Sequence, residues 1–82
     1  MPKLKRLSGE EVARVFLRMG FEQVGQRGSH IKLRRLATDG SRQTLTIPNH
    51  NEIDTGTLRA IYRQALRYVP ESELRPYFYS PE

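Results

Sequence analysis

The sequence contains no cysteine, which excludes disulfide bonds and thiolate metal ligands as sources of stability. It has no apolar run of membrane-spanning length, and no signal-peptide pattern opens it. We therefore expect a protein that works in the cytoplasm and does not contact a membrane. A chain of 82 residues predicts one domain over residues 1–82, with a small hydrophobic core.

Acidic side chains are scarce in the middle of the chain. Between residues 23 and 51, Asp39 is the only acid. The basic residues there are Arg27, Lys32, Arg34, Arg35 and Arg42. Such an excess of positive charge attracts polyanions, so RNA or DNA is the natural partner. Solvated side chains that only maintain solubility would give the same charge count.

Two segments have the apolar spacing of amphipathic helices. Ser8 and Glu11 form a capping box, which predicts a first helix over residues 9–19. A second helix is predicted to begin at Asp54 or Thr55 and to end before Pro70. Residues 71–75 could add one further helical turn.

Three short strands are predicted between the helices, over residues 21–26, 30–36 and 42–47. The order helix, three strands, helix favours an α+β fold with an antiparallel sheet and both helices on one face. Its core would span about residues 7–69. The remaining segments are a loose basic arm at residues 1–6 and an aromatic, proline-bounded tail at residues 70–82, whose role the sequence leaves open.

His30 is the most informative residue, because it follows Gly28-Ser29 at the start of a basic, alternating strand. Alternation places His30, Lys32 and Arg34 on one face of the sheet. A histidine exchanges protons near neutral pH, and the neighbouring cations attract phosphate. This combination suits RNA cleavage, although a surface histidine without a function has the same pattern.

Three patches of sequence together resemble the HicA (YcfA-like) toxins of bacterial type II toxin–antitoxin systems. These patches are Leu17-Arg18-Met19-Gly20-Phe21, then Gly28-Ser29-His30, then Leu45-Thr46-Ile47-Pro48-Asn49-His50 followed by Gly56-Thr57-Leu58-Arg59-Ala60-Ile61. The resemblance implies a double-stranded-RNA-binding-like α-β-β-β-α fold and an mRNA-cleaving endoribonuclease, or mRNA interferase. It also implies inhibition by a HicB-type antitoxin, and it makes His30 the catalytic histidine.

The remaining candidates surround this histidine. Arg27, Lys32 and Arg34 are predicted to bind RNA phosphates, while Gly28 and Ser29 shape the turn and could approach the ligand. His50 is either a second acid/base group or a residue that holds its loop. We expect neither a metal nor a small-molecule cofactor, because Glu52 and Asp54 are better explained as the acidic approach to a helix.

The alternative function is a non-catalytic RNA-binding module of the same fold. Ordinary double-stranded-RNA-binding domains carry a lysine cluster at the start of the last helix, whereas residues 54–59 here contain one cation, Arg59. This difference counts against the alternative. A protein-interaction adaptor would leave the charge of residues 23–51 unexplained.

Overall fold

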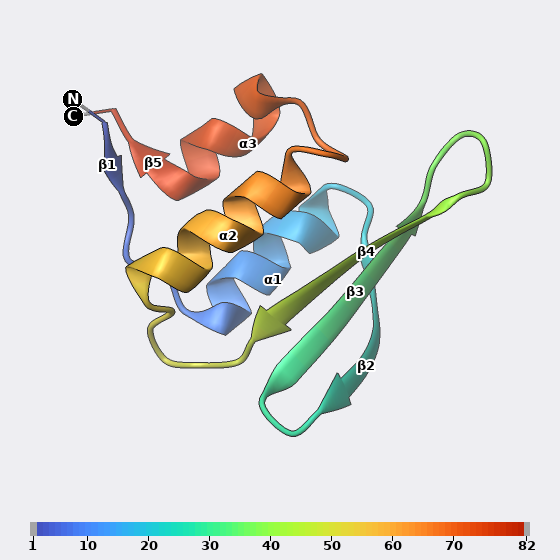
Figure 1. Ribbon diagram of the computed structural model, residues 1–82, viewed down its shortest axis with the longest axis horizontal. Coiled ribbons are helices and arrows are strands. Elements are labelled where there is room, and N and C mark those ends of the chain that lie inside the picture. Colours follow the sequence, from blue (N-terminus) through green and yellow to red (C-terminus); the bar gives the residue numbers. More distant parts are fainter. Residues whose placement is uncertain (1, 82) are drawn as a thin grey trace.

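A computed structural model describes residues 2–81 (Figure 1). Along the chain its elements are β1 (Lys3–Leu4), α1 (Gly9–Arg18), β2 (Glu22–Arg27), β3 (His30–Leu36), β4 (Arg42–Pro48), α2 (Thr55–Ala65), α3 (Glu71–Phe78) and β5 (Tyr79–Ser80). Strands β2, β3 and β4 form an antiparallel sheet with β3 in the centre. Helices α1 and α2 cover one face of that sheet, which confirms the predicted α+β fold.

Helix α1 begins where the sequence predicts. The Ser8 hydroxyl accepts a hydrogen bond from the backbone amide of Glu11 at 3.0 Å, and the Glu11 carboxylate accepts one from the Ser8 amide at 2.9 Å. Two otherwise unsatisfied amides of the first turn are thereby paired. These bonds also hold the pKa of the Glu11 carboxyl below its usual range. The helix turns Val12 and Phe16 into the core, where both are fully buried.

The register of the sheet determines which side chains of β3 face the helices. Ile31 pairs with Ile47 and Leu33 pairs with Leu45, and all four side chains are buried beneath α1 and α2. Successive residues of a strand point to opposite faces. The residues between them on β3, beginning with His30, therefore point to the other face, which we call the open face.

The two ends of the chain differ from the prediction. The sequence predicts a loose arm over residues 1–6, of which residue 1 lies outside the described residues. In residues 2–6, β1 instead pairs antiparallel with β5, and the Lys5 amide donates to the Phe78 carbonyl at 2.7 Å. Figure 1 shows these two strands side by side, on the far side of the helices from the sheet. A two-residue strand has no periodicity to detect, because only its distant partner defines it.

The aromatic tail is part of the hydrophobic core. Leu74 and Phe78 lie one helical turn apart on α3 and are both fully buried. The ring centroid of Phe78 lies 5.3 Å from that of Tyr62 and 6.1 Å from that of Phe16. The ring of Phe78 is therefore not available to stack on the bases of a nucleic acid. Tyr77 and Tyr79 are half-buried against the same core.

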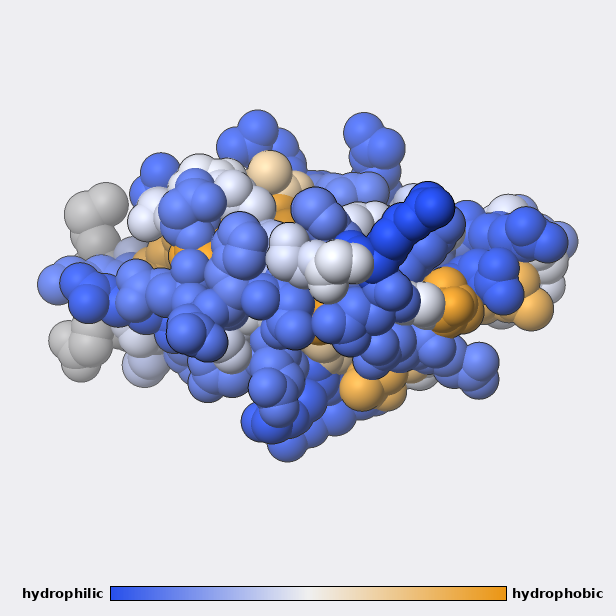
Figure 2. Space-filling model, turned by 90° about the horizontal axis from the view of Figure 1, so that it is seen from below, coloured by the Kyte–Doolittle hydropathy of each residue, from blue (hydrophilic) through white to orange (hydrophobic). Residues whose placement is uncertain are grey.

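The surface is largely hydrophilic, with hydrophobic residues in small patches in the view of Figure 2. Among the described residues, the large hydrophobic side chains that are exposed are Leu17, Val24 and Leu36. No helix within residues 2–81 has both the length and the apolar character needed to span a bilayer.

Candidate RNA-binding and catalytic face

A tight turn places His30 at the edge of the open face. Gly28 has a φ of 57°, while no non-glycine residue of the described chain has a positive φ. A positive φ at the first central position is the pattern of a type II′ hairpin turn, which matches the right-handed twist of the flanking strands. Gly28 and Ser29 thus serve the turn, and His30 is the first residue of β3, with an exposed side chain.

The open face gathers the predicted phosphate ligands in cross-strand rows. Arg27 on β2 pairs with His30, Lys32 pairs with Thr46 on β4, and Arg34 pairs with Thr44. Directly paired residues project from the same face, with Cβ atoms about 4.5–5.5 Å apart. Lys32 and Arg34 therefore share the face of His30, as the alternation predicted, and the register adds Arg27 to them.

The positive charges of the open face form no ion pair within residues 2–81. The ion pairs of the described residues are Arg14–Glu10 and Arg75–Glu71, and both lie on helices away from this face. Glu22 is the acid paired across the ladder with Arg34, yet the two side chains form no ion pair within residues 2–81. Unpaired cations on one surface create the positive potential that attracts a phosphate backbone.

Arg35 lies on the opposite face of β3 and has a structural role. Its guanidinium donates to the backbone carbonyls of Met19 at 2.8 Å and Tyr68 at 2.9 Å, and to the Gln43 side chain at 2.8 Å. It also lies over the ring of Phe21, 4.7 Å from the centroid. These contacts join the end of α1 to the segment after α2, so Arg35 is not available to a ligand of the open face.

Backbone hydrogen bonds hold the loop of His50 against the turn of His30. The Asn49 amide donates to the Ser29 carbonyl, and the Gly9 amide donates to the His50 carbonyl at 2.9 Å. At residue 9, a β-carbon would collide with the carbonyl oxygen of Pro48 and lie 2.8 Å from the Asn49 α-carbon, so only glycine allows this approach. The start of α1 and the two histidine-bearing segments are thus joined.

Neither histidine side chain makes a hydrogen bond or an ion pair within residues 2–81. Both are exposed and free to meet a ligand. The tie between the loop and α1 uses the backbone of His50, and its imidazole is not needed for it. The backbone of His50 therefore has a structural role in its loop, whereas the imidazole is a candidate for contact with RNA.

The acids after β4 belong to a helix terminus. Asp54 is the N-cap of α2, where its carboxylate accepts hydrogen bonds from the Thr57 hydroxyl at 2.7 Å and the Thr57 amide at 3.1 Å. These bonds hold the pKa of the Asp54 carboxyl below its usual range. In residues 2–81, histidine and acidic side chains do not gather in groups of three that could hold a metal ion.

Arg42 is a cation of the open face that was not among the site residues predicted from the sequence. It pairs with Leu36 across the ladder, so it lies on the open face beyond Arg34. The sequence contained this information, because Arg42, Thr44 and Thr46 alternate with Gln43 and Leu45 along the strand and so lie on the face opposite Leu45. The alternation alone does not say which residue of β3 is its neighbour. The register of β3 and β4 shows that Arg42 lies beside Arg34.

Comparison with known proteins gives one match. The model of a family described as HicA toxin of bacterial toxin-antitoxin matches residues 9–66, which is more than half of the 82 residues. The matched region begins at α1 and extends just past α2, so it includes the whole sheet and the open face. No curated protein and no solved structure matches the chain.

Proposed function

Because the chain belongs to the HicA toxin family of bacterial toxin–antitoxin systems, we propose that it is a metal-independent endoribonuclease that cleaves mRNA in the cytoplasm. The observation that supports this most is the exposed His30 beside Arg27, on a sheet face whose cations have no acidic partners in residues 2–81. A proton-transfer group thereby lies within a surface that binds phosphate.

The reaction needs no nucleophile from the protein. The 2′-hydroxyl of the RNA attacks the adjacent phosphorus, loses its proton, and forms a 2′,3′-cyclic phosphate. The bond to the 5′-oxygen breaks, and that oxygen takes up a proton as it leaves. His30 makes one of these proton transfers, a contribution typically worth about 10²–10⁴-fold in rate. Arg27 and Lys32 stabilise the charge that develops on the phosphate oxygens.

The first test concerns metal and products. We expect cleavage of a long RNA to continue at an unchanged rate in EDTA, because the histidine mechanism uses the substrate's own hydroxyl. The new ends should carry 2′,3′-cyclic phosphate and 5′-hydroxyl groups, and strands with 2′-deoxyribose should remain intact. Mass spectrometry of the fragments identifies the two kinds of end and shows whether the 2′-deoxy strands are intact. Activity that disappears in EDTA and returns with Mg²⁺ would contradict the mechanism, and binding without any cleavage would favour the non-catalytic module.

The family implies an antitoxin partner, and we propose that it is a HicB-type protein that covers the open face. A toxin of this kind must be restrained in its host, and an exposed cationic face favours an acidic partner surface. RNA and antitoxin should then compete for His30, Lys32 and Arg34.

Charge reversal tests this competition. Replacing Lys32 and Arg34 together with glutamate should weaken the binding of both RNA and antitoxin by at least tenfold at low salt, because attraction becomes repulsion. The matched control reverses two exposed arginines away from the open face, Arg63 on α2 and Arg67 in the turn just after it. NMR shifts would map the interface. Antitoxin shifts confined to α2, with cleavage unaffected by the complex, would rule out direct occlusion.

A further inference from the structure

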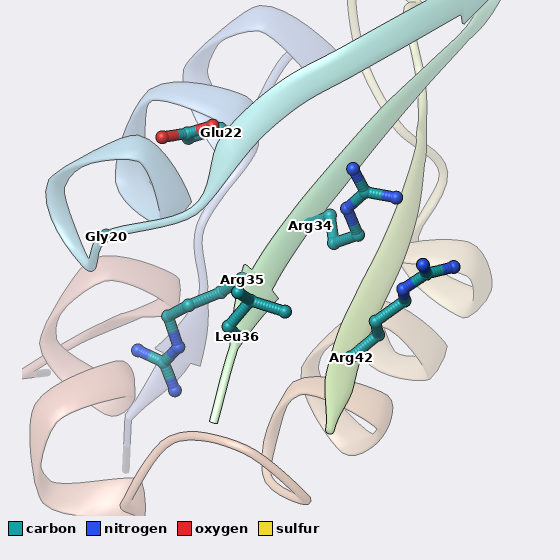
Figure 3. A pocket seen from close by; sticks show the side chains of 6 residues that line it. All are labelled: Gly20, Glu22, Arg34, Arg35, Leu36 and Arg42. Carbon is teal, nitrogen blue, oxygen red and sulfur yellow. The ribbon is translucent and has the colours of Figure 1, made fainter. Parts of the chain in front are cut away.

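A hollow lies at the end of β3 that is farthest from His30. Its volume is about 440 Å³, and it is lined by Gly20, Glu22, Arg34, Arg35, Leu36 and Arg42 (Figure 3). Arg34 pairs with Thr44, and Leu36 pairs with Arg42, so the two arginines are diagonal neighbours on adjacent strands. In Figure 3 their side chains extend to the same side of the sheet.

These two arginines carry like charges on adjacent strands. Within residues 2–81 neither guanidinium makes an ion pair. Glu22 lines the hollow, but Figure 3 shows its carboxylate pointing away from both arginines, and Arg35 points to the other side toward its carbonyl partners. Two like charges held this close repel each other. An anion bound between Arg34 and Arg42 would remove this repulsion.

We propose that Arg34 and Arg42 form a second phosphate subsite, which holds the RNA backbone away from the scissile bond. This inference rests on the function proposed above. Arg34 lies four positions after His30 on β3, a span of about 13 Å at the rise of a β-strand. A strand that occupies both places must continue beyond the nucleotide that is cut. The subsite therefore selects a long RNA over a dinucleotide.

The side chains of the sheet also determine which part of the RNA the subsite can recognise. Between Glu22 and Pro48 the sequence contains no phenylalanine, tyrosine or tryptophan. Proteins that hold single strands by their bases stack them on aromatic side chains. The open face offers guanidinium and ammonium groups instead, so it holds the phosphate backbone. The contribution of the open face to RNA affinity is independent of base sequence and falls steeply with salt.

The test measures binding apart from cleavage. Wild-type protein and the variant Arg42→Gln are titrated with an uncleavable 2′-deoxy strand of about 12 nucleotides, within the usual range of single-strand sites, and with a 2′-deoxy dinucleotide. We expect the variant to bind the long strand about three- to tenfold more weakly and the dinucleotide equally well. Loss of one phosphate contact should also lower the slope of log K against log salt by about 0.7.

Two further variants keep the result interpretable. Arg42→Lys retains the charge and should restore most of the affinity for the long strand, whereas Arg63→Gln on α2 should bind both ligands like wild type. Unchanged binding of the long strand by Arg42→Gln, or equal losses for the long strand and the dinucleotide, would overturn the subsite. A wild-type protein that shows the length effect but cleaves no RNA would overturn the proposed function and leave the subsite standing.

Discussion

Replacing His30 with alanine is expected to reduce the rate of RNA cleavage by about 10²–10⁴-fold, the usual contribution of a positioned proton-transfer group. The free energy of unfolding should change by less than about 0.5 kcal/mol, because the side chain is exposed and makes no hydrogen bond within residues 2–81. RNA affinity should stay close to that of wild type, since the phosphate contacts come from the neighbouring cations. Cleavage of a long RNA, chemical denaturation and RNA titration measure the three quantities.

His50→Ala is the matched control for this variant. Its imidazole is also exposed, and the bond that ties its loop to Gly9 uses the backbone carbonyl, which alanine retains. A similar loss of cleavage in His50→Ala would make the second histidine a partner in proton transfer. Cleavage by His30→Ala near the wild-type rate would rule out His30 as the catalytic group, and unfolding of that variant would make it structural.

Phe78→Ala is expected to lower the free energy of unfolding by about 3–5 kcal/mol, the usual cost of deleting a buried phenyl ring. Its ring is fully buried and touches the aromatic cluster between α1 and α2. For a chain this small, such a loss is a large part of the total stability. Equilibrium unfolding in urea, followed by circular dichroism, would measure it.

The control for this variant lies on the same helix. Ser72 is exposed, so Ser72→Ala should change the free energy of unfolding by less than about 0.5 kcal/mol. A cost below about 1 kcal/mol for Phe78→Ala would show that α3 frays from the core in solution. The expected cost instead makes α3 necessary to the fold, although it lies outside the matched residues 9–66.

The sequence predicted those parts of the fold that local chemistry determines. The capping box at Ser8 and Glu11 located the start of α1, and strict alternation on β3 correctly separated the side of His30 from that of Leu33. Strand β4 was predicted to end one residue early, at Ile47, because proline cannot donate to a ladder; Pro48 nevertheless pairs with His30 as the last residue of the strand.

What the sequence could not supply depends on contacts between distant segments. The sequence predicted at most one helical turn over residues 71–75, whereas α3 continues through Pro76 to Phe78. Proline disfavours a helix interior, but burial of Leu74 and Phe78 outweighs that local preference. Strand β1 exists because β5 lies beside it. For the candidate face, alternation in the sequence placed Lys32 and Arg34 on the side of His30. That Arg42 lies next to Arg34 follows only from the register of β3 and β4.

The close approach of Gly9 to the segment after β4 determines how this edge of the open face moves. The amides of Gly9 and Asn49 donate across the junction between α1, the loop of His50 and the turn of His30. Segments joined in this way open together, as one cooperative unit, and not as separate flaps. Under the function proposed above, His30 stands on a pre-organised platform, so an RNA would spend little binding energy on ordering the protein.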